Sequence, residues 1–247
     1  QEHGTAFPEK LAISLWSSEA IRHLGVLEAQ VLHAMGLRPK WNEAGKVIAL
    51  DIVPDVEMKH PRIDVVVQAT SVYRDQFDPF LRMLADAVER LSCMPAAASN
   101  PIARNSAAVE RALRQRGMSE EQAKALSKLR VFSNAPGEFG SGLGRAVLDR
   151  AEGASKDDAT LANGFLENLQ YGYDAKGRAV TLPGGNPFAE QLRGAQAPVL
   201  SRSSNVTGLL TTDHPFADPG ALAFAVRHLA ADTPSPLSPA PRAAPPP

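Results

Sequence analysis

The sequence predicts an α/β fold: an open, mostly parallel sheet flanked by helices, with a helix-rich second part and a disordered Pro-rich tail. Three observations support this fold class. Residues 63–69 (IDVVVQA) are almost continuously apolar, as in a strand buried on both faces of a parallel sheet. Helical patterns follow this run and the shorter apolar run at 11–16. Seven of the last fifteen residues are prolines.

The first segment, residues 1–95, alternates strands and helices, as in an open α/β sheet. Its expected elements are a strand at 11–16, a helix that begins near Ser17 and ends at Gly36, strands at 46–53 and 63–69, and a helix at about 76–91. The cluster Ser17, Ser18 and Glu19 is typical of a helix start.

The second segment, residues 96–232, is richer in helix and contains a second α/β portion. Its expected elements are helices at about 102–116, 119–128, 156–170 and 219–230, a short β run with a Gly-rich loop at 129–144, an exposed loop at 171–186, and a strand with a turn at 197–212. Residues 233–247 are expected to be disordered or polyproline-like, because proline fits neither a helix interior nor a packed strand.

Composition excludes several classes of protein. With 26 Lys and Arg against 27 Asp and Glu, bulk electrostatics does not favour a nucleic-acid or anionic-membrane partner. A single cysteine, Cys93, excludes an intramolecular disulfide framework and fits a reducing, cytoplasmic location. No apolar run reaches the roughly 18–20 residues of a membrane helix. The chain begins at Gln1 rather than Met, so we expect a piece of something longer.

The Gly-rich loop at 136–144 is the most unusual local feature. Its glycines, among them Gly137, Gly140 and Gly142, allow positive φ and close approach of the backbone to a ligand. The loop is no Walker A motif, since no Lys-Ser/Thr follows it, and its spacing does not match a Rossmann fingerprint. A ligand loop and a structural turn both remain open.

Two further polar clusters are candidate sites. Tyr73, Arg74 and Asp75 follow a buried strand, at the edge where open α/β sheets bind ligands, although Asp75 as a helix cap beside a surface arginine is an equal alternative. The second cluster offers hydroxyl, amide, guanidinium, carboxylate and imidazole groups to a ligand or metal, or forms ordinary turns. It consists of Ser201, Arg202, Ser203, Ser204, Asn205, Asp213 and His214.

The sequence contains neither the motif of a serine hydrolase nor a histidine pattern typical of a metal site. Neither Ser203 nor Ser204 lies in a G-x-S-x-G elbow. The six histidines show no HxH or HxxxH spacing, so only His214 is retained as a candidate.

Taken together, six segments in order across residues 7–230 resemble the cobaltochelatase large subunit, a relative of the H subunit of magnesium chelatase. The matching stretches are Ile13–Trp16, Glu28–Leu32 with Met35–Pro39, Pro61–Val67, Tyr73–Phe77, Val131–Gly137 with Gly140 and Gly142, and Ser201–Asn205. The match covers an interior-to-C-terminal portion of that family. His3 is not assigned to the family's upstream His-Gly-Thr motif, because no Glu-Trp follows it here.

The resemblance implies a large subunit that binds a tetrapyrrole and works with AAA+-type ATPase subunits. The complex would insert cobalt, as the substrate ion, into hydrogenobyrinic acid a,c-diamide in cobalamin biosynthesis, while ATP and magnesium are used by the partners. We expect this fragment alone to be inactive. A magnesium-chelatase-type subunit acting on protoporphyrin IX, a non-catalytic tetrapyrrole-binding module and a small-molecule enzyme with a phosphate-binding glycine loop are the alternatives.

Metallation removes pyrrole protons and dehydrates the cation, which calls for a base and for oxygen or nitrogen ligands. We therefore predict Asp213 and His214 as catalytic and metal-handling residues, with Glu138 as a second catalytic candidate. The alternative is a helix-capping Asp213 and a surface His214. The predicted substrate-binding residues are Tyr73, Arg74, Asp75, Gly137, Gly140, Gly142, Ser201, Arg202, Ser203, Ser204 and Asn205. The two loops are expected to line one cleft with residues 73–75.

Overall fold

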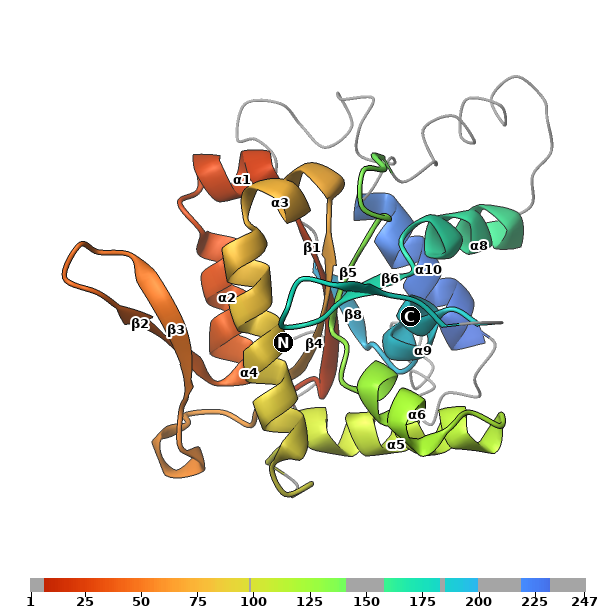
Figure 1. Ribbon diagram of the computed structural model, residues 1–247, viewed down its shortest axis with the longest axis horizontal. Coiled ribbons are helices and arrows are strands. Elements are labelled where there is room, and N and C mark those ends of the chain that lie inside the picture. The colour runs from red at the N-terminus through yellow and green to blue at the C-terminus, as the bar shows by residue number, and fades with distance from the viewer. Residues whose placement is uncertain (1–6, 98, 141–157, 183–184, 200–218, 232–247) are drawn as a thin grey trace, which may run out of the picture.

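A six-stranded sheet runs through the centre of the computed structural model, which describes residues 7–97, 99–140, 158–182, 185–199 and 219–231 (Figure 1). Its strand order is β7-β6-β5-β4-β1-β8. The bounds are β1 (Lys10–Leu15), β4 (Asp64–Ala69), β5 (Val131–Ser133), β6 (Tyr171–Tyr173), β7 (Ala179–Val180) and β8 (Ala197–Val199). The strands β8, β1, β4 and β5 are parallel, whereas β6 is antiparallel to β5 and β7. The predicted open, mostly parallel α/β sheet is confirmed.

The two central strands are buried on both faces, as the apolar run at 63–69 predicted. Along β4, Val66 packs into one hydrophobic cluster, while Val65 and Val67 pack into another on the opposite face. Ala12 and Ile13 of β1 divide in the same way. This alternation is what a strand with a period of two requires when helices cover both faces.

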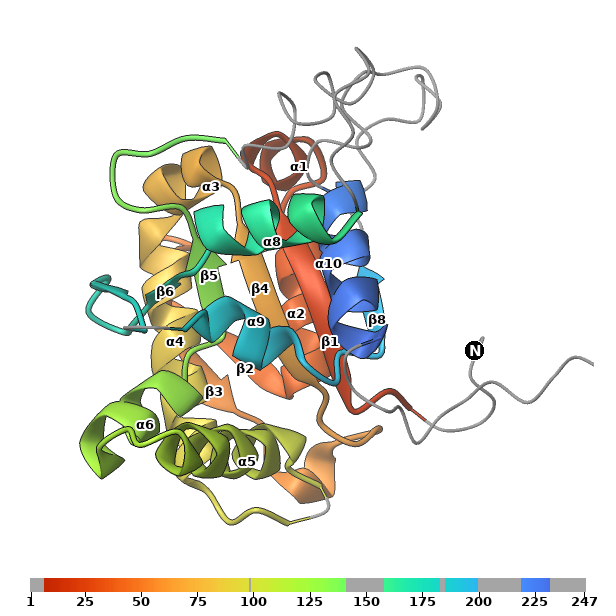
Figure 2. The same ribbon diagram turned by 90° about the vertical axis from the view of Figure 1, so that its right-hand side faces the viewer.

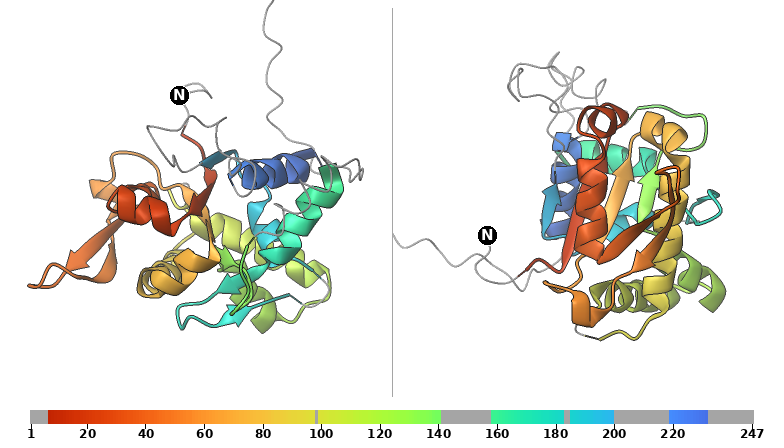
Figure 3. Two further views of the ribbon diagram at one scale, coloured as in Figure 1. Left: turned by 90° about the horizontal axis from the view of Figure 1, so that it is seen from above. Right: turned by 90° about the vertical axis from the view of Figure 1, so that its left-hand side faces the viewer.

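Helices form a layer on each side of the sheet. One layer holds α1 (Ser17–Arg22), α2 (Val26–Met35), α3 (Ser71–Gln76) and α4 (Asp78–Cys93), and the other holds α6 (Glu120–Ser127), α8 (Asp158–Asn168), α9 (Pro187–Leu192) and α10 (Pro219–Ala231). Figure 2 shows α8, α9 and α10 in front of the sheet, and the right panel of Figure 3 shows α2 and α4 on the opposite face. α5 (Pro101–Gln115) crosses below the sheet beside α6. No helix in the described ranges is long and apolar enough to cross a membrane.

Two expectations about local structure were wrong, and one strand was missed. The helix expected from Ser17 to Gly36 is broken between α1 and α2, where Leu24 (φ 53°) and Gly25 (φ 78°) are left-handed. The strand expected at 46–53 is β3 (Val47–Ile52), but it pairs with an unpredicted β2 (Leu37–Trp41) in a hairpin that projects from the main sheet (Figure 1). The range 171–186 is not simply an exposed loop, because β6 adds to the sheet and Tyr173 is buried there.

A buried ion pair joins the amino end of β4 to β5. Arg130 donates from Nε to Asp64 Oδ1 at 2.7 Å and from Nη2 to Oδ2 at 3.0 Å, and both side chains are fully buried. Burial alone raises the pKa of Asp64, but the charges of Arg130 and Lys10 more than offset it and hold the pKa below its ordinary value. The carboxylate therefore stays ionised inside the protein.

The sheet takes strands from both sides of residue 95, since β5 pairs with β4 and β8 pairs with β1. The predicted segment boundaries at 95 and 232 stay predictions. Residues 233–247 lie outside the described ranges, and so does the expectation of disorder there.

Candidate functional site

The carboxyl ends of β1, β4, β5 and β8 meet at one edge of the sheet because these four strands are parallel. α1 begins directly after β1, and α3 begins directly after β4. In Figure 1 this edge is at the top, where α1 and α3 lie side by side. We call it the carboxyl edge. Ligands of open α/β sheets bind in this position.

Arg74 reaches from α3 to the start of the Gly-rich loop. Thr70 caps α3 by accepting a hydrogen bond from the Tyr73 backbone N–H at 3.3 Å. One turn on, the buried Arg74 donates from Nη1 to the carbonyl oxygens of Asn134 and Ala135, each at 2.9 Å. Its Nε donates to Asp75 Oδ1 at 2.8 Å. The structure therefore brings two of the predicted clusters together.

Arg74 stays protonated despite its burial. Burial lowers the pKa of the guanidinium, but the hydrogen bond and charge of Asp75, together with Tyr173, outweigh that effect and raise it. Asp75 is half exposed, so the ion pair has one partner in the core and one at the surface. Asp75 lies inside α3 and does not cap the helix that follows, because α4 has Phe77 at its N-cap and no side-chain cap hydrogen bond.

Asn134 and Tyr173 complete this network, and both were missed from the sequence. Tyr173 donates its hydroxyl hydrogen to the Asn134 carbonyl at 2.6 Å, with the Arg74 guanidinium carbon 5.9 Å from its ring centre. Asn134 Nδ2 donates to the Gly140 carbonyl at 2.6 Å, which closes the loop 135–140 on itself. Asn134 belongs to Val131–Gly137, one of the six segments that resemble the family, so the sequence could have pointed to it. Tyr173 lies among polar and glycine residues outside those segments, and nothing in the sequence marks it.

Tyr73 points into the protein. Its side chain is fully buried, stacks on Phe77 with ring centres 4.7 Å apart, and donates a hydrogen bond to Glu28 Oε1 at 2.8 Å. Burial and the negative charge of Glu28 raise the pKa of the phenol, so it keeps its proton. Tyr73 thus anchors α3 to α2, and its predicted substrate-binding role stays a prediction.

The described part of the Gly-rich loop uses two glycines for left-handed backbone. Gly137 has φ 83° and Gly140 has φ 82°, a conformation that side chains disfavour. Glu138 lies exposed between them, with its backbone N–H bonded to the Ala135 carbonyl at 3.0 Å. The remaining predicted residues lie outside the described ranges: Gly142, Ser201, Arg202, Ser203, Ser204, Asn205, Asp213 and His214. Their roles and the shared cleft stay predictions.

Three polar atoms around the carboxyl edge are buried without a hydrogen-bond partner among the described residues. They are Ser17 Oγ after β1, Ser133 Oγ at the end of β5 and Glu28 Oε2 beside Tyr73. Buried polar atoms are costly unless they are paired, so these groups suit a polar ligand or another part of the chain. Two hydroxyls can donate or accept, and the carboxylate oxygen can accept from an N–H.

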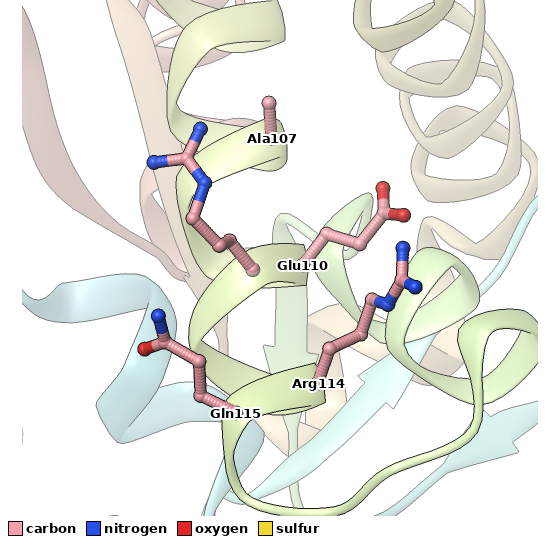
Figure 4. A pocket seen from close by; sticks show the side chains of 5 residues that line it. Ala107, Glu110, Arg114 and Gln115 are labelled. Carbon is pink, nitrogen blue, oxygen red and sulfur yellow. The ribbon is translucent and has the colours of Figure 1, made fainter.

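A depression of about 510 Å³ lies well away from this edge, along α5 (Figure 4). Its lining side chains all come from that one helix and include charges of both signs: Ala107, Glu110, Arg111, Arg114 and Gln115. Arg114 also forms an ion pair with Glu120 at 3.6 Å. A surface formed by a single helix offers no convergent chemistry, so the carboxyl edge is the better candidate site.

The fold and this edge define an open α/β module with polar side chains gathered at the carboxyl ends of its parallel strands. The model of the CobN/Magnesium Chelatase family matches residues 1–238, and the chain belongs to this family. The resemblance inferred from the six segments is thereby confirmed.

Relatives of both metal specificities are similar to this chain. The magnesium-chelatase H subunit of Cereibacter sphaeroides is 30% identical over 224 residues, which cover 89% of this chain and 18% of that protein. Aerobic cobaltochelatase subunit CobN of Sinorhizobium sp is 28% identical over 238 residues, with 95% and 18% covered. The catalytic subunit of cobaltochelatase from Mycobacterium tuberculosis superimposes with a TM-score of 0.79 at 28% identity, over 92% of this chain and 18% of that one. The chain thus spans 18% of the length of each.

Proposed function

We propose that the chain is part of the tetrapyrrole-binding large subunit of an ATP-dependent cobaltochelatase, which inserts cobalt into hydrogenobyrinic acid a,c-diamide. The family match over residues 1–238 carries this proposal, with the likeness to the solved cobaltochelatase subunit in support. In this proposal AAA+-type partners in the cytoplasm hydrolyse ATP, and the large subunit binds the ring and receives the cobalt ion.

The carboxyl edge supplies the groups that such a role needs. The ring's amide and carboxyl substituents need hydroxyl, amide and cationic partners, and the orphaned Ser17 and Ser133 hydroxyls are of that kind. Metallation also needs a base for the pyrrole protons. Glu138, Asp213 and His214 are the proposed candidates, of which Glu138 is exposed on the loop that Arg74 and Asn134 hold.

The magnesium alternative rests on a specific observation, the 30% identity to the magnesium-chelatase relative. The two chemistries differ in the ring as well as in the ion. Hydrogenobyrinic acid a,c-diamide carries many polar side groups, whereas protoporphyrin IX is a flatter, mostly apolar macrocycle. The choice of ring therefore discriminates between the two proposals.

The test is a binding titration of the folded chain with each ring, followed by absorbance and by quenching of tryptophan fluorescence. We expect saturable binding of the corrinoid precursor and weaker binding of protoporphyrin IX. The reverse preference would support the magnesium alternative, and a folded chain that binds neither ring would contradict both proposals.

Turnover in a longer subunit that contains residues 1–238, assembled with its ATPase partners, tests the candidate bases. Asp213→Asn, His214→Ala and Glu138→Gln are compared with Glu43→Gln, which changes an exposed carboxylate near the β2–β3 turn. Substitution of the residue that acts as the base should lower the rate of cobalt insertion and leave the affinity for the ring unchanged. If all three variants turn over like Glu43→Gln, none of them is the base.

A further inference from the structure

Two histidines far apart in the sequence meet at the surface. His33 is on the last turn of α2, and His60 precedes β4. Their Nε2 atoms are 3.1 Å apart, and their ring centres are 4.5 Å apart with the planes inclined by 61°. No HxH or HxxxH spacing predicts this pair, because its members are 27 positions apart in the sequence.

A backbone carbonyl fixes the protonation of His60. The Nδ1 of His60 lies 2.8 Å from the carbonyl oxygen of Pro61. A carbonyl only accepts, so Nδ1 carries the hydrogen and the Nε2 of the neutral ring presents its lone pair toward His33. Metal-binding histidines are oriented in this way, with one nitrogen on the ion and the other N–H on a backbone oxygen.

The distance between the two Nε2 atoms fits a shared ion. With metal–nitrogen bonds of about 2.1 Å, the observed 3.1 Å separation gives an N–metal–N angle of about 95°. That angle suits neighbouring positions of an octahedral or square-planar ion. The two rings do not lie end to end. In that arrangement the distance between their centres would be the 3.1 Å Nε2 separation plus the distance from each centre to its Nε2, which exceeds the observed 4.5 Å. Without a metal, His33 Nε2 donates the hydrogen of this contact to His60 Nε2. A metal ion that displaces that hydrogen to solvent can be bound by both nitrogens.

The surroundings leave room for an ion with bound water. The pair helps to line a cavity of about 390 Å³ between α2, the start of β2 and the segment 53–60, which is ample for several water molecules. Glu57, in the same lining, is bound to Arg38 at 3.0 Å, so its carboxylate is already paired. The described ranges hold no group of three or more His, Cys, Asp or Glu side chains placed to bind a metal, so a site at this pair would have two protein ligands.

We propose that His33 and His60 form a bidentate surface site for a borderline divalent transition-metal ion such as Ni²⁺, Cu²⁺ or Co²⁺, with water in the remaining positions. Imidazole nitrogen suits these ions better than Mg²⁺ or Ca²⁺, which prefer oxygen. Because Pro61 lies before the first residue of β4, the site is at the amino edge of the sheet, opposite the carboxyl edge. It is a separate site from the one that would handle the ring.

The primary test is calorimetric titration of the untagged chain with Ni²⁺. All proteins carry His3→Ala and His214→Ala, because both histidines lie outside the described residues and could bind metal independently. We expect His33→Ala and His60→Ala each to weaken binding by at least about tenfold, the loss that even an outer partner of a ligand causes. His23→Ala is the matched control, since His23 follows the last residue of α1 and contacts Glu19, and the Ni²⁺ affinity of this variant should equal that of the parent.

Further readouts separate one shared site from two independent histidines. The double variant should lose less binding free energy than the two single variants lose in sum, because either substitution already breaks the chelate. With Cu²⁺ as probe, electron paramagnetic resonance should show two coordinated imidazole nitrogens in the parent and one in each single variant. Unchanged Ni²⁺ affinity in both single variants, or a parent spectrum without two nitrogens, would overturn the proposal. None of these measurements depends on chelatase activity.

Discussion

Arg74 connects the helix after β4 to the loop after β5. Its guanidinium is a donor to two backbone carbonyls, which would otherwise be buried with fewer partners. The residue was predicted to bind substrate, and it is placed where it also shapes the candidate site. Substrate binding by Arg74 is measured as ring affinity, and its structural role is measured as the free energy of unfolding.

We predict that Arg74→Ala lowers the free energy of unfolding by about 2–3 kcal/mol, because it removes charge-assisted hydrogen bonds to buried carbonyls. Urea unfolding measures this loss, and limited proteolysis should cut the loop at 135–140 faster. Arg38→Ala is the control, since its ion pair with Glu57 is exposed and contributes less than about 1 kcal/mol. Wild-type stability in Arg74→Ala would show that the contacts to Asn134 and Ala135 contribute little.

The burial of Lys10 lets us predict how the stability of the protein depends on pH. Burial lowers the pKa of its amine from 10.5 to about 8, with Asp64 acting in the opposite direction and Arg130 in the same one. Between about pH 8 and 10.5 the unfolded chain therefore binds a proton that the folded chain has lost. Since stability rises with pH wherever the unfolded state binds more protons, this group contributes rising stability across that window.

The expected gain from Lys10 between pH 8 and pH 10 is about 2 kcal/mol. Urea unfolding of the wild type and Lys10→Met at the two pH values isolates it, because other titrating groups contribute equally to both proteins. The wild type should gain about 2 kcal/mol relative to the variant. Parallel pH profiles would mean that Lys10 has an ordinary pKa.

At the scale of single elements, Gly36 shows how the end of α2 determines the path into β2. It ends the helix in the left-handed conformation, with φ 67°. Arg62 Nη1 donates to the carbonyls of Met35 and Gly36 at 3.0 and 2.9 Å, directly beside the glycine. A Cβ at Gly36 would lie against Arg62 Nη1 and 2.7 Å from Met58 Sδ.

We predict that Gly36→Ala lowers the free energy of unfolding by more than about 2 kcal/mol, since it adds a steric clash to backbone strain. Gly45→Ala is the matched control: its φ is 73°, but no atom lies within 4 Å of the new Cβ. The control should therefore lose only the strain of about 1–2 kcal/mol. Equal losses in thermal or urea unfolding would show that the contact with Arg62 and Met58 relaxes freely.

Elements with strong local signals could be predicted from the sequence, and elements defined by distant pairing could not. The run at 63–69 is apolar throughout, and β4 follows from it directly. β6 has only three residues, Tyr171–Tyr173, and it exists because it pairs with β5 some 40 residues earlier in the chain, which no local pattern reveals. The break before α2 was missed because the apolar spacing continues past Gly25.

The candidate site shows the same division. The position of Arg74 at the end of a buried strand was predictable, because parallel strands share a carboxyl edge. Its partner Asn134 directly follows β5 and its partner Tyr173 belongs to β6, and only the assembled sheet brings them together. The pairing of His33 with His60 was equally invisible, since α2 and the segment before β4 become neighbours only on folding.

At the scale of the whole molecule, the sheet joins the two sequence segments. β5 and β8 lie beyond residue 95, yet they flank β4 and β1. Residues 1–95 alone would expose the sheet face that carries Ala12 and Val66, which packs against helices of the second segment. They would also leave Asp64 in the core without Arg130, and a buried charge without its partner costs about 3–5 kcal/mol.

We therefore predict that residues 1–95 do not fold alone and that adding residues 96–247 restores the fold. Both tryptophans, Trp16 and Trp41, belong to the first fragment, so its fluorescence reports complementation without a signal from the second. Trp16 donates from Nε1 to Ser14 Oγ at 3.0 Å, so its emission should change when β1 joins the sheet. A first fragment that unfolds cooperatively by itself, with the midpoint of the whole chain, would instead make residue 95 a true domain boundary. Adding a second fragment that carries Arg130→Met separates the ion pair from strand pairing. It should restore less of the signal, because Asp64 then loses its ion-pair partner in the core and keeps only the hydrogen bond from Asn105 and the charge of Lys10.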